Sequence, residues 1–296
     1  MVSMVILNYN DWELTANYSQ KIRSMNVVDH IVIVDNCSPD GSYDRLKDLQ
    51  SEKIDVIQAE SNGGYAKGNQ LGVRFVTEHY GDEGIVIISN PDIEVDEQAI
   101  VDLKEALREN ASLFAVTGLI YNLNDELIPL FTWRLPTVPM LFVNSCTVLR
   151  NLLFKFFGYG TKIRKNTVDF SQALISCEAL PGCFFAADLK KWNEIGGFCE
   201  KTFLFYEEDI LFTKAKEQGM QAALVPSAKI RHLEGVTVKK TLNSWKKREL
   251  LLQDSCVVYM REALHKGSWI TNAYKIWDRF WLPERYLFYK IKNRRG

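Results

Sequence analysis

The densest acidic cluster in the chain is Glu207, Glu208 and Asp209, which stand side by side after an apolar aromatic run. Neighbouring carboxylates beside aromatic side chains raise one another's pKa. A carboxylate with a raised pKa suits general-base catalysis, in which it takes a proton from a hydroxyl group. The alternative interpretation is structural, because the helix dipole also favours acidic residues at a helix N-terminus.

Asp92 and His232 form a second candidate group, which suits a divalent cation. Asp92 ends the segment Asn90-Pro91-Asp92, which follows an all-apolar run that would hold the carboxylate at a sheet edge. Mg²⁺ and Mn²⁺ accept carboxylate and imidazole donors and keep phosphate oxygens as further partners. The alternatives are that Asp92 caps a helix beginning near Glu97 and that His232 is an ordinary structural histidine.

Polar residues also follow three other apolar runs. In an open parallel sheet, ligands bind outside the carboxyl ends of the strands. The residues that we assign to ligand binding on this ground are Asn8, Tyr9, Asn10, Asp35, Asn62, Gly64, Asn69, Asn90 and Asp92. Neither G-x-G-x-x-G nor a Walker A lysine motif is present, so no dinucleotide or P-loop site is predicted. Asp35 and Asn62-Gly63-Gly64 have an alternative interpretation as turn residues.

The elements that position these residues follow from hydrophobic patterns. Four apolar runs alternate with three helical segments over the first part of the chain. The runs are 2–7, 30–35, 54–58 and 85–89, and the helical segments are 12–25, 42–50 and 66–79. Continuous apolar runs indicate parallel strands that are buried on both faces. We therefore predict a doubly wound α/β fold for residues 1–120.

Beyond residue 120 the pattern loosens. Residues 112–119 are predicted to be a strand, and residues 121–170 to be irregular because of their paired prolines. The later predicted elements are helices at 187–195 and 210–218 and a strand at 222–225. We divide the chain into a body, residues 1–238, whose two halves meet near residue 120, and a helical tail, residues 239–296.

Composition narrows the class of protein. The chain has 296 residues with 36 Lys+Arg, 37 Asp+Glu and 47% hydrophobic residues, which excludes disordered, collagen-like and disulfide-scaffold proteins. The charge is unevenly distributed along the chain, because residues 239–296 carry a net charge of +9 and residues 1–238 carry −10. An acidic body disfavours nucleic acid as the main partner.

The cysteines and the hydropathy predict a cytoplasmic protein. Six scattered cysteines form no C-x-x-C pair, and the N-terminus leads into a strand-like segment without a basic start. We therefore expect free thiols in a reducing compartment and no signal peptide. The longest uncharged stretch, residues 135–149, falls short of the roughly 20 apolar residues of a spanning helix.

The tail combines basic and aromatic residues. They are Lys246-Lys247-Arg248, Trp269, Trp277, Phe280, Trp281, Tyr286, Phe288 and Tyr289. Such side chains bury rings at the level of lipid headgroups and bring positive charge to anionic lipid, which predicts peripheral attachment to the cytoplasmic face of the inner membrane. The alternative is that these aromatics form a small helical core or a homodimer contact.

Six segments, in their order and spacing, resemble the glycosyltransferase family 2 pattern of GT-A enzymes, in particular the bacterial rhamnosyltransferase-like branch. The segments are VILNYND (5–11), IVIVDNCSPDGS (31–42), ESNGGYAKGNQLG (60–72), SNPDIEV (89–95), LPGCFFAADLKKWNEIGGFCEKTFLFYEEDIL (180–211) and VPSAKIRH (225–232). The resemblance covers about residues 1–235. It implies an α/β, GT-A type fold with a Rossmann-like, mostly parallel sheet flanked by helices.

The resemblance also implies a site. It predicts a nucleotide-sugar donor across the first three loops with Asp35 near the base or ribose, Mg²⁺ or Mn²⁺ at the D-x-D motif, and inversion at the anomeric carbon. Asp92 matches the second Asp of D-x-D, and His232 matches a late histidine that can join the metal. Glu208 matches the general base, with Asp209 as the base if the loop shifts by one residue.

Other positions match the acceptor segment or depart from the pattern. Gly182 and Cys183 match the segment that faces the acceptor. Asn90 replaces the first D-x-D carboxylate, which predicts weak metal dependence because an amide brings no negative charge to a cation. Cys199 stands where the family pattern has Asp, and this substitution changes a local acceptor contact.

The resulting hypothesis is an inverting glycosyltransferase that acts on a glycan or lipid-linked acceptor in the synthesis of cell-surface polysaccharide such as capsule. The branch favours dTDP-rhamnose as the donor, with hexose, N-acetylhexosamine and galactofuranose donors as alternatives. A nucleotidyltransferase is disfavoured because residues 8–11 contain neither glycine nor Lys/Arg. An inactive glycan-binding or scaffold protein is the alternative that Asn90 supports.

Overall fold

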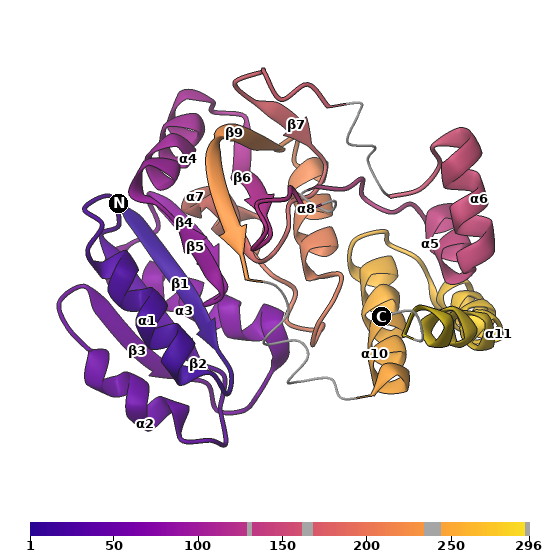
Figure 1. The fold of residues 1–296 in the computed structure, drawn as a ribbon, viewed down its shortest axis with the longest axis horizontal. Coiled ribbons are helices and arrows are strands. Elements are labelled where there is room, and N and C mark those ends of the chain that lie inside the picture. The colour runs from indigo at the N-terminus through magenta and orange to yellow at the C-terminus, as the bar shows by residue number, and fades with distance from the viewer. Residues whose placement is uncertain (129–131, 162–167, 234–243, 294–296) are drawn as a thin grey trace.

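The computed structural model describes residues 1–128, 132–161, 168–233 and 244–293. Within them, nine strands form one sheet in the order β3-β2-β1-β4-β8-β6-β9-β5, with β7 paired to β9. Figure 1 shows this sheet flanked by helices, with α5, α6, α10 and α11 gathered at one end of the molecule.

The elements have the following bounds. The strands are β1 (Val2–Asn8), β2 (His30–Asp35), β3 (Ile54–Gln58), β4 (Ile85–Ser89), β5 (Ile93–Val95), β6 (Leu113–Tyr121), β7 (Ile175–Cys177), β8 (Phe184–Asp188) and β9 (Gln221–His232). The helices are α1 (Trp12–Arg23), α2 (Ser42–Leu46), the short 3₁₀ helix η1 (Lys47–Leu49), α3 (Gly64–Tyr80), α4 (Glu97–Glu109), α5 (Val138–Ser145), α6 (Thr147–Phe157), α7 (Leu189–Glu194), α8 (Glu207–Glu217), α10 (Trp245–Glu262) and α11 (Ser268–Asn293).

The first four strands confirm the predicted parallel, doubly wound half. β1 pairs in parallel with β2 and β4, and β2 pairs in parallel with β3. The register places Asn8 beside Asp35. The carboxyl ends of these strands therefore meet at one edge of the sheet, where the polar loops begin.

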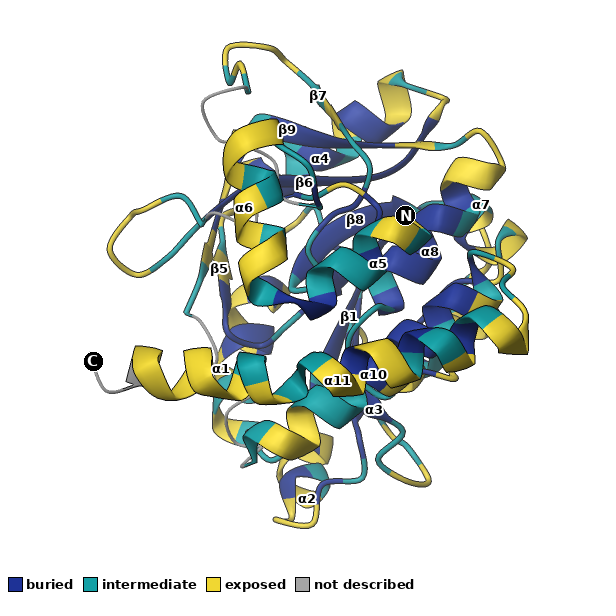
Figure 2. Ribbon diagram, turned by 90° about the vertical axis from the view of Figure 1, so that its right-hand side faces the viewer, coloured by how far each residue is buried: buried dark blue, intermediate teal, exposed yellow. Residues whose placement is uncertain are grey.

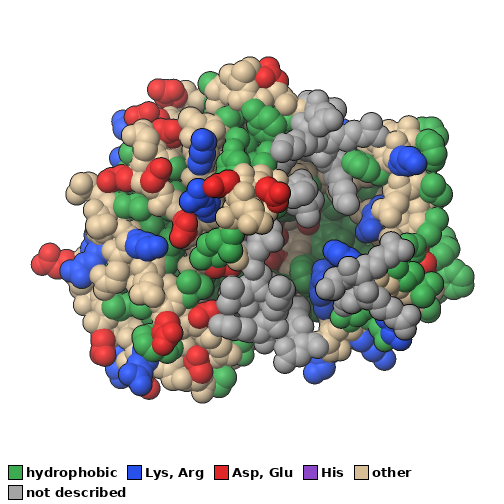
Figure 3. All heavy atoms as spheres, viewed as in Figure 1, with side chains coloured by type: hydrophobic (Ala, Val, Ile, Leu, Met, Phe, Trp, Pro, Cys, Tyr) green, Lys and Arg blue, Asp and Glu red, His purple; other side chains and the backbone are tan. Residues whose placement is uncertain are grey.

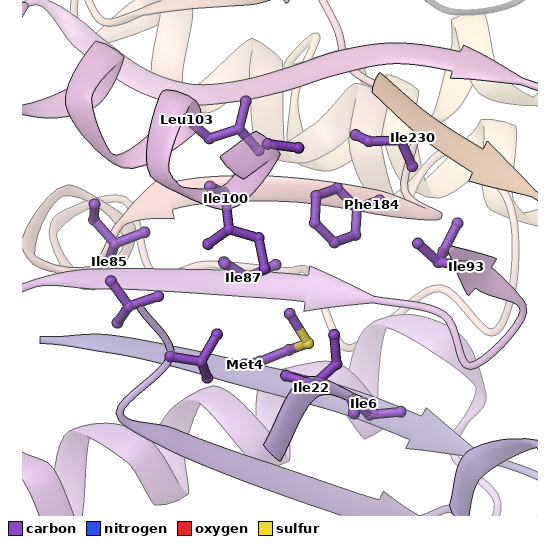
Figure 4. Packing of buried hydrophobic residues seen from close by; sticks show 14 of the residues in the cluster. Met4, Ile6, Ile22, Ile85, Ile87, Ile93, Ile100, Leu103, Phe184 and Ile230 are labelled. Carbon is purple, nitrogen blue, oxygen red and sulfur yellow. The ribbon is translucent and has the colours of Figure 1, made fainter. Parts of the chain in front are cut away.

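Both faces of the sheet are covered by apolar side chains. Along β1, Met4 and Ile6 join the cluster that packs beneath α1, α2 and α4, whereas Val5 joins the cluster beneath α3, α7 and α8. Successive side chains of a strand point to opposite faces, so a strand with apolar residues at every position needs two covering layers. Figure 4 shows the first cluster, in which Phe184 of β8 lies among side chains from α4, β4 and β9.

The prediction that a helix begins at Ala187 is wrong. Residues 184–188 form β8, an antiparallel strand between β4 and β6. The helix α7 begins directly after this strand, at Leu189. Phe184 and Phe185 are fully buried on opposite faces, so no polar alternation marks this strand in the sequence.

The strand predicted at 222–225 is also longer, since β9 continues to His232. A register shift against β6 between Val225 and Lys229 accommodates Pro226 within the strand. Proline has no amide proton for the sheet ladder, and a bulge tolerates that loss. The continuation beyond Pro226 is what carries His232 to the edge of the site.

Residues 121–170 are not uniformly irregular, because they contain α5 and α6. Pro139 lies in the first turn of α5, where a missing amide proton breaks no helical hydrogen bond. The prolines that argue against a helix in the sequence are thus placed where a helix accepts them.

The tail forms helices, as predicted, and these pack against the body. Tyr259 and Met260 of α10 and Tyr274 of α11 share a buried cluster with Leu141 of α5 and Ile210 of α8. The boundary predicted after Val238 lies outside the described residues. No helix in the described ranges is both long and apolar enough to cross a bilayer.

Candidate active site

Asp92 and His232 are brought together by antiparallel pairing of β5 with the end of β9. The register pairs Ile93 with His232, and the backbone N–H of Leu233 donates to the carbonyl of Asp92. The His232 Nε2 lies 3.3 Å from Asp92 Oδ1. The alternative that Asp92 caps α4 is wrong, because Asp96 is the cap and accepts a hydrogen bond from the N–H of Ala99.

The Asp92 carboxylate is buried and incompletely satisfied. Its Oδ1 is in ion-pair contact with His232 but outside hydrogen-bond geometry, and it has no hydrogen-bond partner within the described residues. Burial acts to lower the pKa of His232, but Asp92 and Cys183 outweigh it and raise that pKa to about 10. The imidazolium therefore offsets the negative charge of Asp92 in the free protein.

Asp92 fits a cation that takes its other ligands from a substrate, and His232 can join it as a ligand only after its imidazolium loses a proton. No group of three or more His, Cys, Asp and Glu side chains suited to a metal occurs in the described part of the chain. Mg²⁺ commonly binds through one or two carboxylates and substrate phosphates. The buried Asp92 Oδ1, which lacks a hydrogen bond, is a donor atom of that kind.

The three predicted catalytic carboxylates begin α8, and only Glu208 is more than marginally exposed. Glu207 is 3% and Asp209 9% exposed, whereas Glu208 is half-buried. Asp209 Oδ1 accepts a hydrogen bond of 2.9 Å from Trp133 Nε1. Of the three, Glu208 is thus the one open to a reacting hydroxyl.

Burial shifts these carboxylates in the direction that a base requires. It raises the pKa of Glu208 to about 7, with a contribution from the charge of Asp209, and that of Asp209 to about 6. Burial raises the pKa of Glu207 well above its ordinary value, and Glu207 Oε2 has no hydrogen-bond partner in the described residues. A base with a pKa near 7 is partly ionised at neutral pH and binds a proton strongly.

Gly182 and Cys183 connect the two groups. A Cβ at position 182 would overlap Glu208 Oε1, so the backbone of Gly182 lies directly against that carboxylate. The adjacent Cys183 lies beside His232 and raises its pKa. The predicted base and the predicted metal ligands are therefore held at either end of a two-residue segment.

Tyr65 also contacts the Gly182-Cys183 segment. Its hydroxyl donates a 2.5 Å hydrogen bond to the carbonyl of Gly182. Burial raises the pKa of Tyr65 well above its ordinary value, and the charges of Glu208, Glu207, Cys183 and Asp92 raise it further. One phenol is thus within electrostatic reach of both groups.

A cavity opens beside these residues at the carboxyl edge of the sheet. Its lining includes four predicted donor-binding residues, Tyr9, Asn62, Gly64 and Asn90. It also includes residues absent from the predicted set, which are Leu7, Asn36, Tyr65, Pro91, Phe203 and Leu204. Asn36 stands next to Asp35 in a predicted loop, so its position was available in the sequence, whereas Phe203 arrives from a distant segment.

The glycine at position 64 is required by geometry. Gly64 has φ +83°, and a Cβ there would overlap the carbonyl of Phe203, which accepts a hydrogen bond from the N–H of Tyr65. Asn62 Oδ1 accepts hydrogen bonds from Asn36 Nδ2 and from the N–H of Gly64. The Asn62-Gly63-Gly64 turn thus closes the cavity against the segment that leads into α8.

Three predicted donor-binding residues are fully buried and hold the loops together. Asn8 Nδ2 donates to Asp35 Oδ1, and Asp35 Oδ2 accepts from the N–H of Ser38 and from Gln58 Nε2. Asn69 Nδ2 donates to the carbonyl of Tyr65. None of these three residues lines the cavity, so direct donor contact by them stays a prediction.

Asn10 lies beside this network in a left-handed conformation with φ 55°. Its N–H donates to Ser38 Oγ, and its own Oδ1 is buried with no hydrogen-bond partner in the described ranges. The loop after β1 is therefore fixed by the loop after β2, next to Tyr9 in the cavity.

Comparison with known proteins shows the family of the chain. The family model described as "Glycosyl transferase family 2" matches residues 3–172, more than half of the chain, and the chain belongs to that family. A curated relative is the low-salt glycan biosynthesis hexosyltransferase Agl10 of Haloferax volcanii, 25% identical over 224 residues. The match covers 74% of this chain and 62% of the relative, so the chain spans about three fifths of that protein's length.

Solved structures show the same GT-A fold. A mannosyltransferase of Pyrobaculum calidifontis in complex with GDP-Man and Mn²⁺ has a TM-score of 0.57 at 16% identity, covering 95% of this chain and 72% of the other. GalNAc-T7 with UDP, GalNAc and Mn²⁺ has a TM-score of 0.61 at 16% identity, covering 87% of this chain and 48% of the other.

The packing of Gly182 against Glu208 can be tested by a double-mutant cycle. Gly182→Ala adds a methyl group where Glu208 Oε1 lies, so we expect a loss of about 1–3 kcal/mol in the free energy of unfolding. In a Glu208→Ala background the same change is expected to cost at least about 1 kcal/mol less. Chemical denaturation measures both values.

Gly267→Ala is the matched control, because a Cβ at position 267 meets nothing within 4 Å. We expect it to change stability by no more than about 0.5 kcal/mol in either background. Equal costs for Gly182→Ala with and without the Glu208 side chain would show that the two residues are not in contact.

Proposed function

We propose that this protein is an inverting glycosyltransferase that moves a sugar from a nucleotide-sugar to a hydroxyl group of a glycan or lipid-linked acceptor. The observation that carries the proposal is the position of Gly182-Cys183, with Glu208 at one end and the Asp92–His232 pair at the other. Family membership and the hexosyltransferase relative support it. The complexes of neighbours with GDP-Man or UDP and Mn²⁺ agree with a nucleotide-sugar donor.

The donor occupies the cavity at the carboxyl edge of the sheet. Its walls offer the rings of Tyr9 and Tyr65 and the amides of Asn36, Asn62 and Asn90, which suit a planar base and the hydroxyl groups of ribose and sugar. dTDP-rhamnose is the donor that the sequence pattern favours. A hexosyl donor is the rival that the curated relative favours.

Glu208 acts as the general base. Its carboxylate takes the proton of the acceptor hydroxyl, the acceptor oxygen forms a bond to the anomeric carbon, and the bond between that carbon and the donor diphosphate breaks. The electron pair and negative charge leave with the diphosphate. Because attack and departure take place on opposite sides of the carbon, a single displacement inverts the anomeric configuration.

Asp92 and His232 are the residues that would hold Mg²⁺ or Mn²⁺. When bound, the cation offsets the negative charge of the departing diphosphate. Asn90 offers only an amide oxygen on the same loop, so this chain brings less negative charge to a cation than a D-x-D pair brings.

Nucleotide release is the first test. The full chain incubated with dTDP-rhamnose, GDP-mannose, UDP-glucose or UDP-N-acetylglucosamine is expected to release nucleotide from one donor, and Mn²⁺ is expected to increase the rate by less than about a hundred-fold. A coupled phosphate assay with and without EDTA measures both effects. Absence of release from every donor would instead favour a glycan-binding or scaffold protein, the alternative that Asn90 supports.

Glu208→Gln is expected to reduce transfer at least about a thousand-fold while donor binding, measured by thermal shift, stays unchanged. The amide has nearly the shape of the carboxylate but takes no proton at neutral pH. Glu217→Gln, at the exposed other end of α8, is the matched control and should transfer at the wild-type rate.

The pH dependence checks the same assignment. Glu208 must be ionised to accept a proton, so kcat/KM should rise with pH through about 7 and level off above it. Asp209→Asn removes a negative neighbour and should move this rise to lower pH. Turnover retained in Glu208→Gln would transfer the role of base to Asp209 or Glu207. A rise that stays in place in Asp209→Asn would show that the titrating group does not feel the charge of Asp209 and would contradict the assignment to Glu208.

We also propose that α6 and α11 attach the enzyme to the cytoplasmic face of an anionic membrane. These two helices carry a set of large apolar side chains that are at least 37% exposed. The set comprises Val148, Leu149, Leu152, Phe156 and Phe157 on α6 and Trp269, Ile276, Trp277, Phe280, Tyr286, Leu287, Phe288, Tyr289 and Ile291 on α11. Figure 2 shows how exposed both helices are, and Figure 3 shows hydrophobic side chains gathered over that end of the molecule.

The charges on α11 support an anionic partner. Its two acids face inward, since Asp278 accepts from Ser145, Gln253 and Arg285, and Glu284 accepts from backbone N–H groups at the start of α6. The exposed charged side chains of α11 are basic, namely Arg279, Lys290 and Lys292. Basic residues among exposed aromatics favour anionic headgroups.

Vesicle flotation tests the membrane surface. The full chain is expected to float with phosphatidylglycerol vesicles and to bind phosphatidylcholine vesicles at least about ten-fold more weakly, since the basic side chains need anionic lipid. A triple variant, Phe157→Ser, Trp269→Ser and Phe280→Ser, should lose the binding.

Leu123→Ser is the control for flotation, because Leu123 is 67% exposed but lies outside the two helices. Equal flotation by all variants would remove the membrane proposal. A concentration-dependent dimer that the triple variant abolishes, without any flotation, would assign the face to a second copy of the chain.

A further inference from the structure

A second cavity, of about 320 Å³, lies among α5, α6, α10 and α11. It is separated from the donor cavity by the segment Phe203–Tyr206, which leads into α8. Phe203 and Leu204 line the donor cavity, whereas Tyr206 lines the second one. Glu207 and Glu208 follow Tyr206 directly, at the start of α8.

This dividing segment is held in an unusual conformation. Phe205 and Tyr206 have φ values of 75° and 63°, in the left-handed region that larger side chains rarely adopt. Tyr206 stacks on Tyr259 of α10, with ring centroids 5.5 Å apart. The left-handed pair is therefore held against α10, next to the start of α8.

The two acidic residues that line the second cavity are both hydrogen-bonded to one arginine. Arg285 Nε donates to Glu249 at 2.8 Å, and Arg285 Nη2 donates to Asp278 at 3.0 Å. Arg285 Nη1 donates to the carbonyl of Ser145. Arg285 therefore links α5, α10 and α11, and its guanidinium donates to protein groups.

Two other arginines line the cavity and make no hydrogen bond to a carboxylate within the described residues. Arg150 of α6 is partly buried, and its fully buried Nε has no hydrogen-bond partner within the described residues, although the charges of Glu284 and Glu249 act to raise its pKa. Arg248 of α10 is exposed and contacts no carboxylate in that part of the chain, although it lies over the Phe205 ring at 6.0 Å. Burial lowers the pKa of Arg150, so its charge is held there at a cost.

We propose that this second cavity binds a phosphate group of the acceptor, held by Arg150 and Arg248. The assignment rests on the proposed transferase function and deepens it by naming the chemical class of the acceptor. A guanidinium donates two parallel hydrogen bonds to phosphate oxygens, and an anion would supply the partner that the buried Nε lacks.

The position of α6 relates this phosphate to the exposed apolar surface. One side of the helix lines the cavity through Arg150, Asn151 and Phe154, whereas Leu152, Phe156 and Phe157 are exposed. A lipid-linked acceptor would place its phosphate in the cavity and its chain along that surface. A soluble sugar phosphate has the same recognisable group, and the experiment below separates the two sources.

Inorganic pyrophosphate in EDTA is the probe for the site, with binding to the full chain measured by calorimetry. Arg150→Gln and Arg248→Ala are each expected to weaken binding at least about ten-fold, because each removes a charged donor. Arg150→Lys should retain more of the affinity than Arg150→Gln, and Arg248 is exposed, so its loss leaves folding intact. Arg108→Ala, an exposed arginine of α4 outside the cavity, is the control and should bind as the wild type does.

His232→Gln separates this cavity from the donor site, because His232 is the positively charged group beside Asp92 when no cation is bound. If pyrophosphate binding is lost in His232→Gln but unchanged in both arginine variants, the anion occupies the donor site and the proposal is overturned. Wild-type protein that binds no pyrophosphate also overturns it. Nucleotide release by the wild-type chain without acceptor is measured in parallel, so failure of the proposed transferase function is seen separately as absence of release.

The source of the phosphate is decided by competition. A short-chain polyprenyl phosphate in detergent, the matching polyprenol and glucose 1-phosphate are each added against pyrophosphate. Displacement by the polyprenyl phosphate at least about ten-fold better than by the sugar phosphate, with none by the polyprenol, assigns a lipid-linked acceptor. Better displacement by the sugar phosphate assigns a soluble one, and displacement by the polyprenol alone contradicts recognition of phosphate.

Discussion

Gly182 and Cys183, which immediately precede β8, lie between Glu208 and the Asp92–His232 pair. These ionisable side chains come from distant parts of the chain. The absence of a side chain at position 182 lets the Glu208 carboxylate lie against the backbone, and Tyr65 fixes the carbonyl of Gly182 from the other direction. Cys183 then lies beside His232. A shift of this segment would change the distance between Glu208 and the Asp92–His232 pair, because no other contact among the described residues links them directly.

The site concentrates charge that folding alone would disfavour. Burying a carboxylate without full hydrogen bonding costs free energy and raises its pKa, as Glu207 and Glu208 show. Asp92 is tolerated because His232 balances its charge, whereas the Nε of Arg150 in the second cavity has no hydrogen-bond partner among the described residues. Each of these groups is suited to a substrate that brings the missing proton, cation or anion.

The helices α10 and α11 of the tail contact the segment that leads into the carboxylates of α8. Tyr259 of α10 stacks on Tyr206, the residue before the three carboxylates of α8, and donates a hydrogen bond to the carbonyl of Pro136. The tail therefore helps to hold the left-handed turn that divides the two cavities. Trp269 and Phe280, two of the aromatic residues predicted to form either a core or a membrane surface, are exposed, whereas Tyr259 and Tyr274, which that prediction did not include, are buried.

The sequence by itself determined the parallel half of the sheet and the types of residue at its carboxyl edge, because apolar runs and polar loops are local patterns along the chain. It also indicated the carboxylate cluster and the Asp92–His232 pair, although their proximity required the pairing of β5 with β9. Only the tertiary structure decided that 184–188 is a strand, that Asp96 rather than Asp92 caps α4, and that Glu208 is more open than its neighbours. These outcomes depend on contacts between segments far apart in sequence, whose energies no local pattern records.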